Sequence, residues 1–198
     1  RKNLFIKIVL PLIIEENEKI LKDRAILFSI LNKNSNSENE LKWLNAKFKQ
    51  YGVKNRDILS LKIRMDIIPT SLTIAQAAKE TGWGTSRFAI EGNALFGQWT
   101  YSGTGIKPLK SSDDENHKVM KFQILKASVR AYHRNLNTHS SYREFRMKRA
   151  EARDNDESLD SLLLANYLDK NAESGLEYTK LLKKIIVQNS LKEFDDVK

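Results

Sequence analysis

The chain of 198 residues has no cysteine and few prolines, glycines or histidines. Without cysteine it can form neither disulfides nor thiolate–metal sites. The three histidines, His117, His133 and His139, are too scattered to predict a metal site, and no motif calls for a cofactor. Only three prolines leave room for long helices. Most of the glycines fall between Gly82 and Gly105, so backbone freedom is concentrated in that stretch.

Long hydrophobic runs are also missing. The first fourteen residues, RKNLFIKIVLPLII, imitate a signal peptide with a basic start and an apolar run. Lys7 and Pro11 interrupt this run, and no small-residue cleavage site follows it. We therefore expect an apolar strap that packs on the domain. No other segment approaches the length of a transmembrane helix.

The charge is unbalanced, with 34 Lys and Arg against 25 Asp and Glu, a net charge of +9. Such a surface favours a polyanionic partner: nucleic acid, an anionic membrane surface or an acidic cell-wall polymer. A lysine-rich composition without functional meaning explains the charge equally well. No arginine–glycine run or basic helix with interleaved aromatic residues is present, so nucleic acid is not predicted.

Apolar residues at helical spacing predict helices over most of the chain. The expected helices cover residues 13–31, 38–50, 58–65, 71–80, 85–90, 125–139, 142–149, 158–167 and 175–191. Two strands, Leu95–Tyr101 and Lys118–Ile124, are expected to pair as a hairpin. This order predicts a mainly α (α+β) fold. Its helical body and small β lobe, at about residues 93–124, would form a cleft where they meet.

Glu80 is the first candidate for chemistry, at the end of an alanine-rich helix and directly before Thr81-Gly82-Trp83-Gly84. A carboxyl group buried beside an indole loses solvation, which raises its pKa. A general acid needs such a pKa at neutral pH, and glycoside cleavage uses a protonated carboxyl group of this kind. On spacing alone, a helix-end carboxylate that pairs with Arg87 or a backbone donor is the more ordinary interpretation.

Longer motifs favour the catalytic interpretation of Glu80. The segments AQAAKETGWGTSRFA (75–89) and GNALFGQW (92–99) resemble the glucosaminidase domain family, glycoside hydrolase family 73. Three further segments are similar to the Bax-type bacterial subgroup of that family: LPLIIEENEKI (10–20), SVRAYHRNLNTHSSYREFRMKRA (128–150) and EYTKLLKKIIVQNSL (177–191). The resemblance covers nearly the whole chain.

The resemblance implies one lysozyme-like domain over residues 1–198, with a helical N-terminal part (1–68) and a catalytic core (69–191). It implies cleavage of the β-1,4 bond on the reducing side of N-acetylglucosamine in peptidoglycan, with Glu80 as general acid. Glycan strands would be the partner, and the protein would be periplasmic or secreted.

The resemblance also implies residues that contact the sugar. Asn93, Phe96 and Gly97 would form the floor of the sugar subsites, where glycine permits close backbone approach. The same residues can also form a tight helix-to-strand turn. Trp83 and Trp99 can stack on sugar rings or belong to the core. We expect Trp83 in the core and Trp99 in the cleft.

The second catalytic group has several candidates. Glycosidases normally use two carboxylates, and Glu115, with Asp113 and Asp114, is the candidate in the hairpin, although an acidic loop is more often merely solvated. Glu91 would line the cleft or cap a turn, and we favour the turn. Without a second carboxylate, the substrate's own acetamido oxygen could attack the anomeric carbon. By resemblance, Tyr178 lies across from the acid, where its phenol would orient the acetamido group or water; ordinary packing on a helix face is equally compatible.

Two other functions stay open. A lytic transglycosylase or muramidase of the lysozyme superfamily would cleave the neighbouring bond, and a degenerate domain would bind glycan without cleaving it. Anionic wall polymers or a membrane surface could dock on a basic cluster, or the cluster could be an ordinary solvated helix face. Its members are Arg143, Arg146, Lys148, Arg149 and Arg153.

Overall fold

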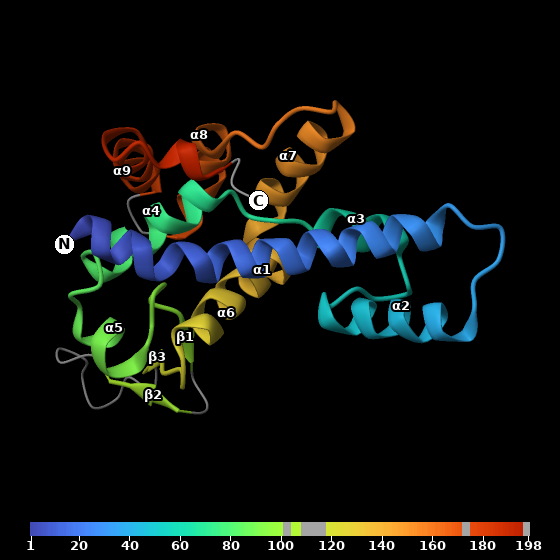
Figure 1. Cartoon of the computed structure of the whole chain (residues 1–198), viewed down its shortest axis with the longest axis horizontal. Coiled ribbons are helices and arrows are strands. Elements are labelled where there is room, and N and C mark those ends of the chain that lie inside the picture. The colour runs from blue at the N-terminus through green and yellow to red at the C-terminus, as the bar shows by residue number, and fades with distance from the viewer. Residues whose placement is uncertain (101–103, 108–117, 172–174, 196–198) are drawn as a thin grey trace.

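The computed structural model of the chain describes residues 1–100, 104–107, 118–171 and 175–195. It is mainly helical with a small antiparallel sheet, which confirms the predicted fold class (Figure 1). The helices are α1 (Lys2–Leu31), α2 (Glu38–Gln50), α3 (Ile58–Arg64), α4 (Thr70–Thr81), α5 (Arg87–Gly92), α6 (Leu125–Thr138), α7 (Arg143–Asp154), α8 (Ser161–Leu164) and α9 (Gly175–Gln188). Short 3-10 helices are η1 (Ser140–Tyr142), η2 (Ala165–Asn171) and η3 (Leu191–Phe194), and the strands are β1 (Trp99–Thr100), β2 (Gly105–Ile106) and β3 (Lys118–Met120).

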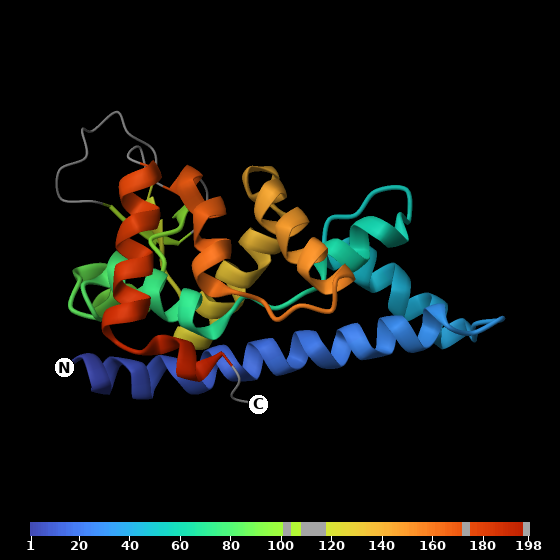
Figure 2. The same ribbon diagram turned by 90° about the horizontal axis from the view of Figure 1, so that it is seen from above.

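Helix α1 runs along one side of the molecule from end to end (Figure 2). We expected a separate strap over the first fourteen residues, but the helix is continuous through Pro11. Phe5, Val9 and Ile13 are buried at successive spacings of four residues, so one apolar face packs against α4 and α6 on both sides of the proline. The segment packs on the domain as predicted, but in helical form. Among the described residues no helix is both long and apolar enough to cross a membrane.

Helix α4 lies at the centre of the larger hydrophobic cluster, with residues from α1, α6 and α9 around it. Lys79 and Glu80 are its only residues that are not buried. Its first turn is capped from far along the chain, because the backbone N–H and the hydroxyl of Ser71 each donate to the Asp195 carboxylate at 2.8 Å. Its last turn ends at Gly82, whose φ of 57° lies in the left-handed region that glycine adopts without strain. Glu80 is thereby held at a helix end.

A second hydrophobic cluster joins the C-terminal half of α1 to α2 and α3. Its buried members are Leu27, Ile30, Leu44, Phe48, Tyr51, Leu61 and Met65. Figure 1 shows this group at the far end of α1 from the sheet and α5. The α1 helix is therefore the element common to both clusters.

The β lobe departs most from the sequence-based expectation. The predicted pairing is confirmed, since Trp99 is opposite Val119 and Thr100 opposite Lys118, but β3 also pairs with β2, giving the order β1-β3-β2. The second predicted strand ends at Met120 and not at Ile124, and the first begins at Trp99 and not at Leu95. The later start of the first strand has two reasons. Gly97 has a φ of 57°, which interrupts extended backbone, and the Leu95 N–H donates to the Ser128 hydroxyl instead of to a strand.

Candidate active site

A cleft of about 590 Å³ lies where α4, α6 and α9 meet the β lobe. The residues that line it are Gln76, Glu80, Phe96, Gly97, Gln98, Trp99, Met120, Ala131, Tyr132, Arg134, Asn135, Leu136, Thr138, Tyr142 and Tyr178. Within the described part of the chain, Glu80 is the one carboxylate among them. The predicted cleft between helical body and β lobe therefore exists, and the predicted acid lies in it.

The Glu80 side chain is half-buried, with 26% of its surface exposed. Its Oε1 atom accepts a hydrogen bond from the Tyr178 hydroxyl at 3.2 Å and lies 3.2 Å from the Lys79 ammonium. The other oxygen faces the glycine turn, since a β-carbon added to Gly97 would lie 3.7 Å from Oε2. The alternative partner Arg87 instead pairs with Glu91 at 3.8 Å. Glu80 thus presents one bonded oxygen and one oxygen on the Gly97 side.

Two more side chains extend the hydrogen bonding behind Glu80. The Gln76 amide donates to the Tyr178 oxygen at 2.9 Å, and the Tyr132 hydroxyl donates to Gln76 Oε1. Burial raises the pKa of Tyr178 far above the usual phenol range, and the nearby Glu80 charge raises it further. Burial likewise raises the pKa of Tyr132. Both phenols therefore stay protonated at neutral pH and can donate.

Aromatic rings also line the cleft. Phe96 stacks on Tyr132 with ring centroids 4.0 Å apart and planes 16° from parallel. Trp99 is 52% exposed, which is unusual for so large an apolar side chain. A partly exposed indole in a cleft can stack on the apolar face of a sugar ring. The structure thus brings together five of the predicted residues: Glu80, Phe96, Gly97, Trp99 and Tyr178.

Three other predicted residues do not line this cleft. Trp83 packs edge-to-face on Phe5, with ring centroids 5.8 Å apart, so it is partly buried against the core and is not one of its fully buried members. Asn93 closes α5 with a φ of 49°, and its amide donates to the backbone oxygens of residues 122 and 123, so it forms the helix-to-strand turn. Glu91 is exposed and pairs with Arg87 beside that turn.

The proposed second carboxylates of the hairpin, Glu115, Asp113 and Asp114, lie outside the described residues.

Sequence reasoning missed several residues of the cleft, above all Gln76, Tyr132 and Arg134. One signal was available for Gln76, because it lies four residues before Glu80 and therefore on the same face of the helix. Tyr132 and Arg134 come from α6, which has no local motif that marks it as part of a site.

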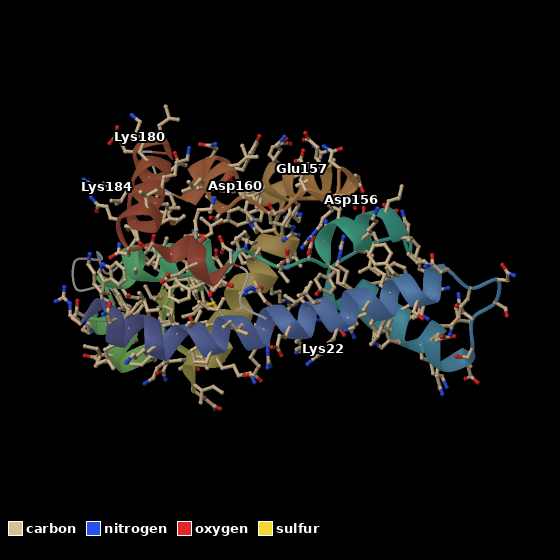
Figure 3. The ribbon with its side chains drawn as sticks, turned by 45° about the horizontal axis from the view of Figure 1, so that its top comes forward. Lys22, Asp156, Glu157, Asp160, Lys180 and Lys184 are labelled. Atoms are coloured by element: carbon tan, nitrogen blue, oxygen red, sulfur yellow. The ribbon has the colours of Figure 1, made fainter. Side chains whose placement is uncertain are left out.

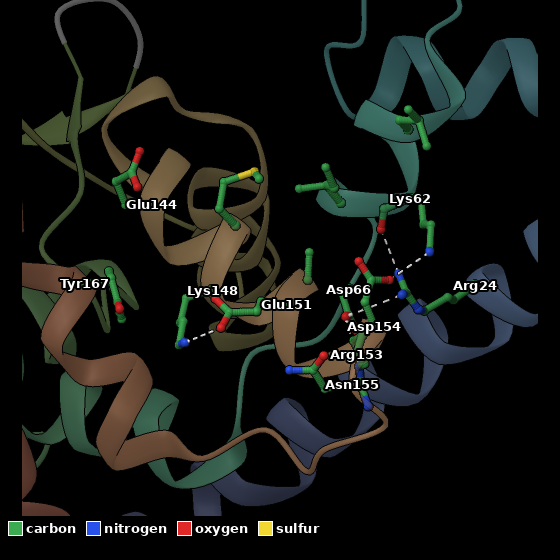
Figure 4. A pocket seen from close by; sticks show the side chains of 14 residues that line it. Arg24, Lys62, Asp66, Glu144, Lys148, Glu151, Arg153, Asp154, Asn155 and Tyr167 are labelled. Atoms are coloured by element: carbon green, nitrogen blue, oxygen red, sulfur yellow. Dashed lines mark hydrogen bonds and ion pairs between the residues drawn. The ribbon is translucent and has the colours of Figure 1, made fainter.

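A second cavity of about 480 Å³ lies between α1, α3 and α7, away from Glu80 (Figure 4). One of the residues that line it is Asp66, which is 2% exposed. Arg153 donates to Asp66 at 3.1 Å, Arg24 lies 3.8 Å away, and Arg149 lies 3.9 Å away. Burial alone would raise the pKa of Asp66, but the arginine charges outweigh it and leave that pKa below its usual value. These contacts join α1 and α7 to the segment that follows α3.

The network corrects the predicted basic docking cluster. Arg146 and Arg149 are 4% and 0% exposed, so neither can belong to a docking surface. Their guanidinium groups donate to backbone oxygens, including those of Leu136 and Ile67. Figure 3 shows instead Lys180 and Lys184 projecting outward from α9, with acidic Asp156 and Glu157 beyond the end of α7. Within the described residues, no group of three histidine or acidic side chains is arranged to hold a metal ion.

Comparisons with known proteins identify the family of the chain. Residues 55–191 match the glucosaminidase family model, described as mannosyl-glycoprotein endo-beta-N-acetylglucosaminidase. The chain is 34% identical to Protein bax of Escherichia coli (strain K12) over 188 residues, which cover 92% of this chain and 67% of that protein. No solved structure gave a significant match. The chain therefore belongs to the glucosaminidase family of glycan-cleaving hydrolases.

Proposed function

We propose that the protein hydrolyses the β-1,4 bond on the reducing side of N-acetylglucosamine in peptidoglycan, with Glu80 as the general acid. The observation that carries the proposal is the position of Glu80 as the one carboxylate among the described residues of a cleft with aromatic walls. The glucosaminidase family match supports the same chemistry. Peptidoglycan lies outside the cytoplasm, so we also propose a periplasmic or secreted location.

In this mechanism, protonated Glu80 donates its proton to the glycosidic oxygen as the bond to the anomeric carbon breaks. The partial exposure of Glu80 lets substrate reach it, and Gly97 leaves the space beside Oε2 free of a side chain. Trp99 and Phe96 would hold the sugar rings by stacking, which orients the scissile bond toward the acid. Tyr178 would hold Glu80 in position through its hydrogen bond to Oε1.

The displacement step needs a nucleophile or an activated water. We propose that the substrate's own acetamido oxygen attacks the anomeric carbon, because no second carboxylate joins Glu80 among the described residues of the cleft. The alternative is that a carboxylate of the hairpin, with Glu115 as the first candidate, acts as the nucleophile or activates the water.

The same single carboxylate favours one rival, a lytic transglycosylase. In that reaction the 6-hydroxyl of N-acetylmuramic acid displaces the leaving group, so no water need be activated and one acid suffices. The two reactions cleave neighbouring bonds and leave different ends on the glycan.

Product ends separate these reactions. Purified peptidoglycan would be digested with the full chain, reduced with sodium borohydride and analysed by mass spectrometry. Muropeptides that end in reduced N-acetylglucosamine support the proposal. Anhydro-muramic ends would support the transglycosylase, and reduced muramic ends a muramidase. Binding to the glycan without any new ends would leave a binding module and overturn the enzymatic proposal.

A further inference from the structure

Three buried polar side chains form a continuous chain behind Glu80. Gln76 is 4% exposed, and Tyr132 and Tyr178 are each 3% exposed. The hydrogen bonds all run in one direction: Tyr132 donates to Gln76, Gln76 donates to Tyr178, and Tyr178 donates to Glu80. A buried polar chain of this kind is costly unless every member is satisfied, and here each member has its partner.

The direction follows from counting protons. A neutral phenol carries one proton, and a primary amide has one acceptor end and one donor end. Tyr132 occupies the acceptor end of Gln76, so the donor end faces Tyr178. The Tyr178 oxygen then accepts from Gln76, and its single proton is left for Glu80. With the amide reversed, Tyr178 would donate to Gln76 and Glu80 would lose its donor.

We propose that Gln76 is a positioning residue. It holds Tyr178 as a donor to Glu80 Oε1 and thereby reserves Oε2, the oxygen on the Gly97 side, for the proton that is transferred. The catalytic meaning of this arrangement rests on the proposed function, whereas the hydrogen-bond direction does not. The Gln76 amide would contact neither the substrate nor the reacting atoms in this role, because it acts through Tyr178.

Other groups also face Glu80 and must stay unchanged in the test. Lys79 lies 3.2 Å from Oε1 on the same helix. Tyr142 from η1 interacts electrostatically with Glu80, and Arg134 from α6 lines the same cleft. Variants at Gln76, Tyr132 and Tyr178 leave all three in place.

The test is the titration of the Glu80 carboxyl carbon by ¹³C NMR in the full chain, assigned with Glu80→Gln. Gln76→Glu replaces the amide with a carboxyl group that, in its ionised form, only accepts, so in that form the Tyr178 proton turns away from Glu80. We expect the Glu80 titration midpoint to move upward, because the charged form loses a hydrogen bond. In a Tyr178→Phe background the same substitution should produce a shift smaller by roughly one pH unit, since only the charge effect remains.

Tyr132→Phe gives an independent variant if Gln76→Glu does not fold. It frees the acceptor end of the Gln76 amide, so the amide can reverse and accept the Tyr178 proton. We expect the Glu80 titration midpoint to move upward, and this shift should disappear in the Tyr178→Phe background. The alkaline limb of the pH profile of kcat on peptidoglycan should move in the same direction. Equal shifts with and without the Tyr178 hydroxyl, or no shift from the variant that folds, would overturn the inference. Absence of cleavage by wild type would instead refute the proposed function, and the NMR cycle would still decide the role of Gln76.

Discussion

At the scale of single residues, the candidate site depends on the space that Gly97 leaves beside Glu80. The glycine has a φ of 57°, and an added β-carbon would lie 3.7 Å from Glu80 Oε2. The sequence indicated both residues, because GNALFGQW and AQAAKETGWGTSRFA are long motifs. Gln76 and Tyr132 also lie in quoted segments, but nothing in the sequence assigned them a role in the site. Their partners lie 102 and 56 positions away in the sequence, so only the fold brings the hydrogen-bonded chain together.

Gly97→Ala tests whether this space is needed. We expect a loss of about 1 kcal/mol of stability from the left-handed backbone and a larger effect on peptidoglycan cleavage, at least roughly tenfold, because the methyl group fills space beside Oε2 that the substrate would occupy. Chemical denaturation and initial rates measure the two effects.

Gly52→Ala is the matched control. Gly52 has a similar φ of 62° and lies in the second hydrophobic cluster region, beside Arg64. The Gly52→Ala variant should lose about as much stability as Gly97→Ala and should cleave peptidoglycan at the wild-type rate. An equal loss of rate in both variants would mean that Gly97 acts only through folding.

At the scale of elements, the helices were predictable because apolar spacing decides them locally, as in α2, whose predicted bounds agree with the structure. The β lobe and the start of α1 were not. Pro11 is a local helix-breaking signal, but the buried face of Phe5, Val9 and Ile13 overrides it. In the lobe, the Leu95 N–H goes to Ser128 on α6, a tertiary hydrogen bond that strand patterning cannot predict.

Pro11→Ala follows from the continuous helix. Proline inside a helix removes a backbone hydrogen bond and crowds the preceding turn, so we expect the substitution to raise the free energy of unfolding by about 2–3 kcal/mol. Urea denaturation measures it, with Lys19→Ala on the exposed face of α1 as a control that should change little. A lower stability for Pro11→Ala would show that the chain needs a break at this position.

At the scale of the whole molecule, the Asp66 network joins segments that are far apart in the sequence. Arg24 from α1 and Arg149 and Arg153 from α7 converge on the carboxylate that follows α3. Asp66, the countercharge of Arg149, lies 83 residues away in the sequence. The local sequence around Arg149 therefore predicted an exposed basic cluster and not a buried arginine. The assignment of the whole chain to one domain stays a prediction.

Asp66→Asn should destabilise the protein by about 3–5 kcal/mol, because it leaves buried arginine charge without its partner. Asp154→Asn, on an exposed ion pair with Lys62, should cost at most about 1 kcal/mol. Denaturant titration of both variants compares a buried and an exposed carboxylate under the same chemical change. Equal losses would contradict the assigned role of Asp66.

The same carboxylate gives a pH dependence with a defined sign. The pKa of Asp66 is lower in the folded protein than its usual value, despite burial, because the arginines outweigh desolvation. Its contribution to stability is therefore complete above its unfolded pKa of about 4 and is lost as the pH falls through the lower folded value. Urea midpoints should fall less steeply with acid in Asp66→Asn than in wild type. Parallel slopes would exclude this linkage.

The central claim is that Glu80 is the acid of a glycan-cleaving site, and the most direct measurement compares Glu80→Gln with Glu177→Gln. Glu177 is an exposed acidic residue on α9 that does not line the described cleft. The account predicts that Glu177→Gln releases soluble muropeptides from purified peptidoglycan at the wild-type rate, while Glu80→Gln, folded and still able to bind the glycan, releases none. Wild-type release by Glu80→Gln would contradict the account.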